Sequence, residues 1–332
     1  MLKDAGAVNA DPNDITISID DAKASRSAVT AAALFFDTQF ASWVRSGGGL
    51  SRRHQSETSS AKRDLFGLVA SGATLHIHRM GRFATTAALY EQFRPPYSPE
   101  FFRAVVESLR LGKQHALIDL GTGPGLLALG FAPYVGRIVG VDPEPAMLKV
   151  AARAADRAGH DLALIESAAE ALPPEVGAFD IVTIGRALHW MDRDLIGPLL
   201  QRLVAPGGVV LVCSARSATD GRNDWLEAYD EARSYWSGTT GRAHDRPALA
   251  TIVADMRFRI GETITVEGRH ELAASDLAHR VLTLSGSSPA ILGDKADAML
   301  HDVEQRLLPF SRAGLLREVV IAHADVAIAP AA

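Results

Sequence analysis

Cysteine is almost absent from this sequence, because Cys213 is the only one among 332 residues. No intramolecular disulfide can form, so a reducing compartment is the expected setting. The N-terminal segment also lacks a cationic stretch ahead of an apolar one, and its longest apolar run, residues 28–36, is too short to cross a bilayer. The sequence therefore predicts a cytoplasmic protein with neither a signal peptide nor a membrane span.

Basic residues are not in excess either. The 34 Lys and Arg are outnumbered by 39 Asp and Glu, which gives a formal net charge of −5. Such a chain has no positive field of the kind that holds a phosphate backbone. The histidines and the cysteine are not grouped at the spacing of metal ligands. We therefore expect no nucleic-acid partner, no membrane partner and no metal.

From residue 80 onward, short aliphatic runs alternate with helical patterns, which indicates a parallel sheet with crossover helices. Each run is short and apolar, as strands covered on both faces should be. The expected strands are residues 116–120, 137–142, 162–166, 180–184 and 209–213, and the expected helices are residues 124–132, 146–158 and 192–204, with another helix opening at Ser98.

The sequence divides into four regions. Residues 1–79 are an N-terminal extension with one helical stripe, made of Val29, Ala33, Phe36, Phe40 and Trp43. That helix packs on the main domain, forms a homodimer contact or covers a pocket; alternatively, the natural chain starts at Met80. Residues 80–222 form the core and residues 223–315 a mainly helical cap, interrupted by an alternating run at 260–266. Residues 316–332 complete the sheet with a strand at 319–328, expected at its edge.

The strongest motif is an apolar strand that runs into a glycine turn and then a helix. Its residues are Asp119, Gly121, Thr122, Gly123 and Gly125. The glycines let the backbone approach a ligand and expose amide hydrogens at a helix N-terminus. A dinucleotide site prefers its third glycine one place later, where this chain has Leu126. A carboxylate at Asp119 would repel a pyrophosphate but attract a cationic ligand, so the turn favours a cationic cofactor.

A second acidic residue, Asp142, ends the next strand about twenty residues beyond the turn. A carboxylate at this position can accept hydrogen bonds from both hydroxyls of a ribose. Together with the glycine turn, Asp142 predicts a ligand that carries a ribose.

With these motifs the sequence resembles the class I S-adenosylmethionine-dependent methyltransferases, within them the small-molecule branch called methyltransferase type 11, which includes trans-aconitate methyltransferases. The resemblance extends from about residue 83 to the C-terminus and also depends on residues 90–97, 169–173, 179–182, 187–192 and 206–208. It implies an α/β fold, Rossmann-like and doubly wound, with a mostly parallel seven-stranded sheet, helices on both faces and a mainly helical cap. It further implies S-adenosyl-L-methionine as cofactor and S-adenosyl-L-homocysteine as product.

In that family the stretch with Tyr90 and Arg94 folds over the cofactor, Ala169 and Glu170 border the adenine, and residues 185–190 line the methionine end. The resemblance thus completes the set of cofactor-binding candidates: Tyr90, Arg94, Asp119, Gly121, Thr122, Gly123, Gly125, Asp142, Pro143, Met147, Ala169, Glu170, Arg186, Ala187 and Trp190.

Some of these residues have a physical role that can be stated. Arg94, helped by the Tyr90 hydroxyl, can bind the cofactor carboxylate. Trp190 or Tyr90 can face the sulfonium, or Trp190 can be a core residue. His189 is the catalytic candidate, since it can deprotonate or orient a nucleophile; otherwise it orders the loop.

Two positions depart from the family pattern. Ala168 replaces a common acidic residue that binds the adenine amino group, so Glu170 or backbone groups must serve instead. Arg186 stands where the family often has a small or amide residue, and an arginine there can pair with an anionic substrate.

The sequence as a whole predicts in-line methyl transfer to an O, N or C nucleophile of a small molecule, for which a general base is optional. Two alternatives stay open. One is a cofactor-binding protein of this fold that catalyses another reaction, such as a cyclisation, or none. The other is a nicotinamide-dependent dehydrogenase, which Asp119 and Leu126 disfavour.

Overall fold

The computed structural model describes residues 8–11, 14–17, 75–77, 86–237, 248–254, 256–284 and 287–331. The chain divides into two compact units, residues 1–79 and 80–332. In the first unit, β1 (Val8–Asp11), β2 (Asp14–Ile17) and β3 (Leu75–Ile77) form a small antiparallel sheet. The helical stripe from Val29 to Trp43, with its expected dimer contact, lies outside the described residues.

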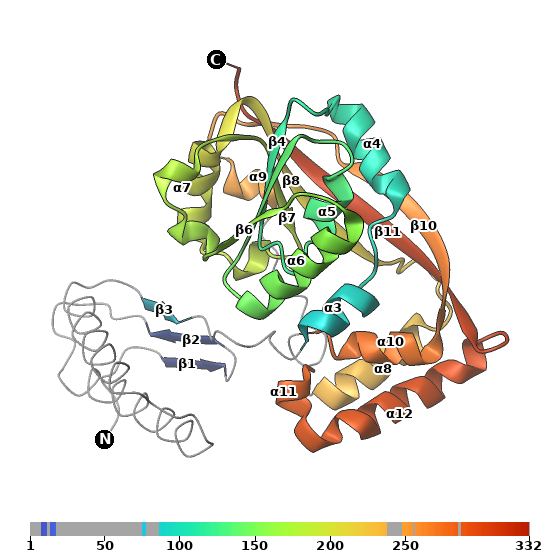
Figure 1. Cartoon of the computed structure of the whole chain (residues 1–332). Helices are drawn as coiled ribbons and strands as arrows, with labels where there is room; N and C mark the ends of the chain where they lie inside the picture. The colour runs from blue at the N-terminus through green and yellow to red at the C-terminus, as the bar shows by residue number, and fades with distance from the viewer. Residues whose placement is uncertain are drawn as a thin grey trace, which may run out of the picture. The chain divides into compact units, whose positions relative to one another are not determined.

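The second unit is built on a twisted, mostly parallel sheet (Figure 1). Five strands are parallel, and they are β4 (Ala116–Leu120), β5 (Arg137–Asp142), β6 (Ala163–Glu166), β7 (Phe179–Gly185) and β8 (Val204–Ser217). Their order is β6-β5-β4-β7-β8, so the chain first winds one way from β4 and then the other. The Rossmann-like, doubly wound α/β fold is confirmed, and ligands of such sheets bind where the winding reverses.

Three antiparallel strands complete the sheet, which therefore has eight strands among the described residues and not the seven expected. β11 (Leu315–Ile328) pairs with β8, and β10 (Ile264–Ala273) pairs with β11, while the short β9 (Arg259–Ile260) adds to the other end of β11. The prediction of an edge strand at residues 319–328 is therefore wrong, because β10 is the edge. Residues along most of β10 alternate between partly buried and exposed, as expected of a strand with one solvated face.

Helices cover both faces of the sheet. On one face α4 (Pro99–Leu109) and α5 (Leu126–Phe131) bury a core around Phe101, Phe102 and Phe131, with α6 (Pro145–Ala158) beside α5. On the other face lie α7 (Arg193–Leu203) and α9 (Leu249–Ile252). Local signals set the ends: the Ser98 hydroxyl accepts from Phe101 N at 3.2 Å to cap α4, and Gly159 ends α6.

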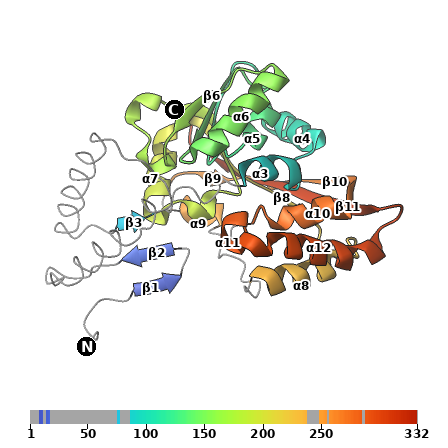
Figure 2. The same ribbon diagram turned by 60° about the horizontal axis from the view of Figure 1, so that its bottom comes forward.

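The cap is a separate helical cluster, in which α8 (Leu226–Ser237), α10 (Ala274–Val281) and α12 (Ala296–Leu307) pack around the fully buried Trp225. The indole N–H of Trp225 donates to Arg317 O at 2.8 Å, which ties the cluster to β11. α11 (Pro289–Leu292) lies at the end of this cluster in Figure 2.

α3 (Ala87–Phe93) lies between the core and the cap (Figures 1 and 2). Arg280 on α10 donates from Nε to Phe93 O at 2.7 Å and makes two bonds, at 2.6 and 2.8 Å, to the buried carboxylate of Glu318 on β11. His270 Nε2 lies 3.0 Å from the same carboxylate. The helix that carries Tyr90 is thereby fixed to the cap and, through it, to the sheet.

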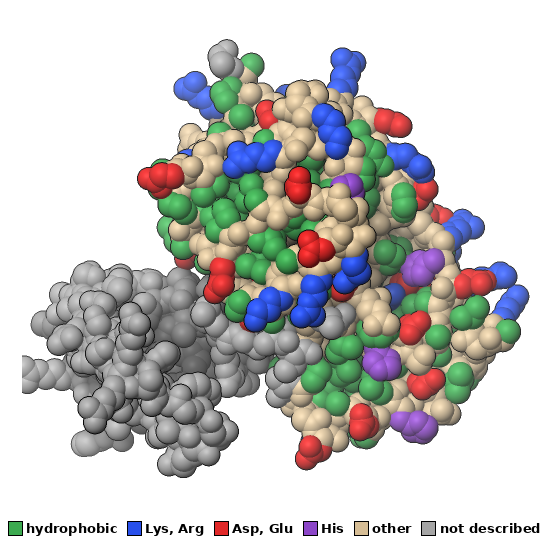
Figure 3. All heavy atoms as spheres, in the orientation of Figure 1, with side chains coloured by type: hydrophobic (Ala, Val, Ile, Leu, Met, Phe, Trp, Pro, Cys, Tyr) green, Lys and Arg blue, Asp and Glu red, His purple; other side chains and the backbone are tan. Residues whose placement is uncertain are grey.

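On the face that Figure 3 shows, acidic and basic side chains of the described residues are interspersed, without a large area of one sign. No helix in the described ranges is both long and apolar enough to cross a bilayer.

Candidate cofactor site

The glycine turn follows β4 as predicted, and its shape depends on glycine. Gly121 has a φ of 66°, and a Cβ added there would lie 2.4 Å from the Cβ of Ala187. At Gly123, with a φ of 54°, an added Cβ would meet nothing within 4 Å. The turn therefore packs tightly against the loop after β7 at one glycine and presents open backbone at the other, as a ligand cradle requires.

Asp119 lies under this turn, with only 1% of its surface exposed. Its two carboxylate oxygens accept hydrogen bonds from the hydroxyls of Thr122 and Thr183, both at 2.7 Å. Burial raises the pKa of Asp119 to about 6, and the two threonine bonds oppose that rise. The carboxyl group therefore takes up a proton as the pH falls through about 6, and a cation bound beside it would favour the charged form.

Asp142 connects the end of β5 to the same turn. Its Oδ2 accepts from Gly123 N at 2.8 Å and its Oδ1 from Glu144 N at 2.9 Å. Thr122 N donates to Val141 O at 2.9 Å. Burial raises the pKa of Asp142, while these backbone bonds favour its charged form. The second predicted carboxylate therefore sits at the glycine turn and helps to hold it.

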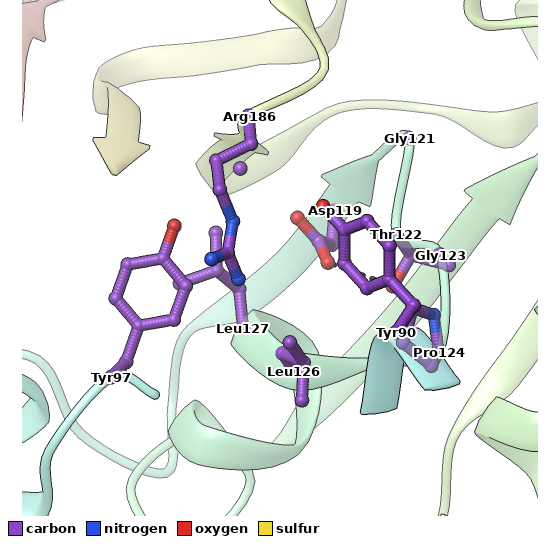
Figure 4. A pocket seen from close by; sticks show the side chains of 11 residues that line it. Tyr90, Tyr97, Asp119, Gly121, Thr122, Gly123, Pro124, Leu126, Leu127 and Arg186 are labelled. Carbon is purple, nitrogen blue, oxygen red and sulfur yellow. Dashed lines mark hydrogen bonds between the residues drawn. The ribbon is translucent and has the colours of Figure 1, made fainter. Parts of the chain in front are cut away.

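A pocket opens beside the turn, at the carboxyl ends of β4 and β7 (Figure 4). It is lined by Tyr90, Tyr97, Asp119, Gly121, Thr122, Gly123, Pro124, Leu126, Leu127, Gly185 and Arg186. Six of the cofactor candidates are therefore brought together, namely Tyr90, Asp119, Gly121, Thr122, Gly123 and Arg186.

Arg94 is not among the lining side chains. Its Nη2 donates to Thr283 O at 2.9 Å, and its Cζ lies 4.6 Å from the centroid of the Tyr90 ring. The carbonyl at the end of α10 thus attracts Arg94 toward the cap. Arg186, by contrast, enters the pocket, and its guanidinium group lies between the rings of Tyr97 and Tyr90 (Figure 4).

The loop after β7 contains a short 3-10 helix, Leu188–Trp190. The rings of His189 and Trp190 lie against each other with centroids 4.7 Å apart and planes tilted by 42°, and both residues are partly buried. Neither side chain lines the pocket. Ala187 supplies the methyl group that the turn packs against at Gly121.

The expected adenine border is the 3-10 helix Ala169–Ala171. The side chain of Ala169 is buried in the core, and Glu170 Oε1 accepts from Asp192 N at 2.7 Å, which fixes it to the start of α7. Neither Ala169 nor Glu170 lines the pocket. Pro143, which is exposed, and Met147, which is buried in α6, do not line it either.

Two polar residues of the site were missed from the sequence. Thr183 stands opposite Asp119 in the register of β4 and β7. As a polar residue in the middle of an apolar strand, it was a signal for a buried hydrogen-bond partner. Tyr97 belongs to the motif at residues 90–97 but was not assigned a role.

Comparison with known proteins finds similarity to methyltransferases over part of the chain. Residues 117–208 match the family model described as a methyltransferase domain. An uncharacterised methyltransferase of Mycobacterium bovis is 31% identical over 150 residues, which cover 45% of this chain and 57% of that protein. The demethylmenaquinone methyltransferase of Thermus thermophilus is 38% identical over 99 residues, which cover 29% of this chain and 45% of that protein. The chain therefore spans about half the length of these relatives.

A solved structure of a candidate type II methyltransferase from Anaeromyxobacter dehalogenans has the same fold. It is 19% identical, with a TM-score of 0.51, over 72% of this chain and 98% of that one. This likeness shows a shared fold, and the family model adds that residues 117–208 are similar to a methyltransferase domain.

Proposed function

We propose that this protein transfers a methyl group from S-adenosylmethionine to an O, N or C nucleophile of a small molecule by in-line displacement. The observation that carries the proposal is the hydrogen-bonded unit of Asp119, the glycine turn and Asp142. It combines an anionic group for a cation, open backbone and a strand-end carboxylate at the reversal point of the sheet.

The residues present fit this cofactor. Asp119 is the anionic partner for its cationic amino-acid end, the open backbone at Gly123 allows close approach, and Asp142 is the acceptor for the ribose hydroxyls. When bound, S-adenosylmethionine supplies a methyl group already activated on a sulfonium.

The chain's own part is then alignment and exclusion of water. Tyr90, Leu126 and Leu127 give the pocket an apolar wall, and α3 is held over it by the bonds to the cap. His189 stays a predicted general base, needed only for an acceptor that is not ionised at neutral pH.

Incubation with methyl-labelled cofactor and a panel of small acceptors tests the proposal, and we expect label in at least one product. Firm binding of S-adenosylhomocysteine without label transfer to any acceptor would favour a non-methylating role. Asp119→Asn is the matched test variant, since it removes the negative charge at nearly constant size. It should lower the rate of methyl transfer relative to the wild type.

A further inference from the structure

Arg186 adopts a backbone conformation that favours glycine. Its φ is 58°, and this left-handed region costs a residue with a Cβ roughly 1 kcal/mol. The residue follows β7 directly, where its N–H donates to Cys213 O at 3.2 Å. The side chain extends into the pocket (Figure 4). Backbone strain at the mouth of a pocket is typical of a residue kept for function.

The guanidinium group of Arg186 has no counter-ion within the part of the chain that the structure describes. Nη1 donates to Pro95 O at 3.1 Å, and the Tyr97 and Tyr90 ring centroids lie 5.0 and 5.7 Å from Cζ. One carbonyl and two aromatic faces leave most of the five N–H donors without a described acceptor. A partly buried cation in this condition is suited to an anion from outside the protein.

The hydroxyl of Tyr97 points to the same ligand. Tyr97 is 8% exposed, and its Oη is buried without a hydrogen-bond partner among the described residues. A Cβ added at Gly185, the residue before Arg186, would lie 3.6 Å from this oxygen, so the hydroxyl faces the end of β7 inside the pocket. Burial raises the pKa of Tyr97, so the group remains a donor. A buried donor is left unpaired at a cost unless a ligand accepts its bond.

We infer that Arg186 and Tyr97 form a carboxylate-binding site at the end of β7, opposite Asp119 in the pocket. A carboxylate matches the planar fork of a guanidinium and can accept a further bond from a phenol. A phosphate dianion fits less well, because Asp119 in the same pocket would repel it more strongly. The carboxylate belongs either to the methyl acceptor or to the amino-acid end of the cofactor. This assignment of the ligand rests on the proposed function.

Calorimetric binding on the full chain separates the two sources. The variants are Arg186→Gln, and Tyr97→Phe, which keeps the ring and removes only the unpaired hydroxyl. The matched controls are Arg103→Gln, at an exposed arginine paired with Glu100, and Tyr134→Phe, at a tyrosine that packs against the same core outside the pocket. Thermal unfolding checks that every variant is folded.

The first comparison titrates S-adenosylhomocysteine against its decarboxylated analogue. If the cofactor supplies the carboxylate, the wild type prefers S-adenosylhomocysteine by at least about tenfold, and both variants lose that preference. The second comparison titrates benzoate against benzamide, with S-adenosylhomocysteine present. If the methyl acceptor supplies the carboxylate, benzoate binds at least about tenfold more tightly than benzamide to the wild type and the controls. The variants that lack Arg186 or the Tyr97 hydroxyl lose this preference.

Either pattern supports the site and names its ligand. The inference is overturned if, in both comparisons, the wild type does not distinguish the carboxylate from its neutral counterpart, or if Arg186→Gln and Tyr97→Phe behave like the two controls. Failure of the proposed function looks different, because S-adenosylhomocysteine would then either not bind at all or bind without label transfer to any acceptor. The benzoate comparison can still be made on the protein alone.

Discussion

The pKa of Asp119 makes cofactor binding depend on pH. Burial raises this pKa to about 6, whereas a bound cation beside the carboxylate favours its charged form and lowers the pKa. Binding of a cationic amino-acid end should therefore release a proton at acid pH. Lowering the pH from about 7.5 to about 5 should weaken S-adenosylhomocysteine binding roughly tenfold, or about 1.4 kcal/mol.

We expect the protein to stay folded at about pH 5. A carboxyl group whose folded pKa is raised makes the folded state relatively more stable as the pH falls through about 6. Glu318 behaves in the opposite way, since burial would raise its pKa but the bonds from His270 and Arg280 outweigh burial and lower it to about 2. Its stabilisation is fully present above an unfolded pKa of 4.5 and is lost only as the pH falls toward 2.

The assay is calorimetric titration at three pH values in buffers of different ionisation enthalpy, which also counts the released protons. Asp119→Asn should bind more weakly at neutral pH and show no such pH dependence. A wild-type affinity that stays constant over this pH range, or an Asp119→Asn variant that keeps the same dependence on pH, would refute this role of Asp119.

Three further predictions follow from the packing. Gly121→Ala should destabilise the protein by roughly 2–4 kcal/mol and abolish S-adenosylhomocysteine binding, because it combines backbone strain with overpacking. Gly159→Ala has the same φ of 66° with open space around it, so it should lower the free energy of unfolding only by the backbone strain, about 1 kcal/mol. Equal losses for Gly121→Ala and Gly159→Ala in chemical denaturation would show that the contact with Ala187 does not matter. Glu318→Gln should lower the free energy of unfolding by about 3 kcal/mol, because it breaks a buried ion pair. Glu271→Gln, at an exposed pair 3.5 Å apart, should change the free energy of unfolding by less than about 1 kcal/mol. Similar losses for the two variants would refute the role of burial. Asp142→Ala should weaken S-adenosylhomocysteine binding by at least about tenfold, because it removes the proposed ribose acceptor and two bonds that shape the turn, and an unchanged affinity would exclude both roles.

The features that local sequence encodes were predictable. β4 and β5 have the predicted bounds, because a short apolar run followed by a glycine turn or an acid-proline pair marks a strand end clearly. The place of β11 was not predictable in the same way. An apolar strand pattern tells that a strand is buried but not which neighbours it has, and the alternating pattern of β10 was needed to recognise the edge.

Long-range packing decides which of the two arginines, Arg94 or Arg186, enters the pocket. Arg94 contacts a carbonyl 189 residues away, and Arg186 enters the pocket because of one left-handed backbone angle. Neither fact leaves a mark in the sequence near these residues. Thr183, in contrast, could have been found, since a lone polar residue in an apolar strand needs a buried partner.

We propose that the glycine turn, with Asp119 and Asp142, holds S-adenosylmethionine and not a dinucleotide. The most direct test of this proposal is calorimetric titration of the full chain with S-adenosylhomocysteine and, separately, with NAD. We expect saturable binding of S-adenosylhomocysteine at one site and no measurable binding of NAD. Binding of NAD without binding of S-adenosylhomocysteine would contradict the proposal.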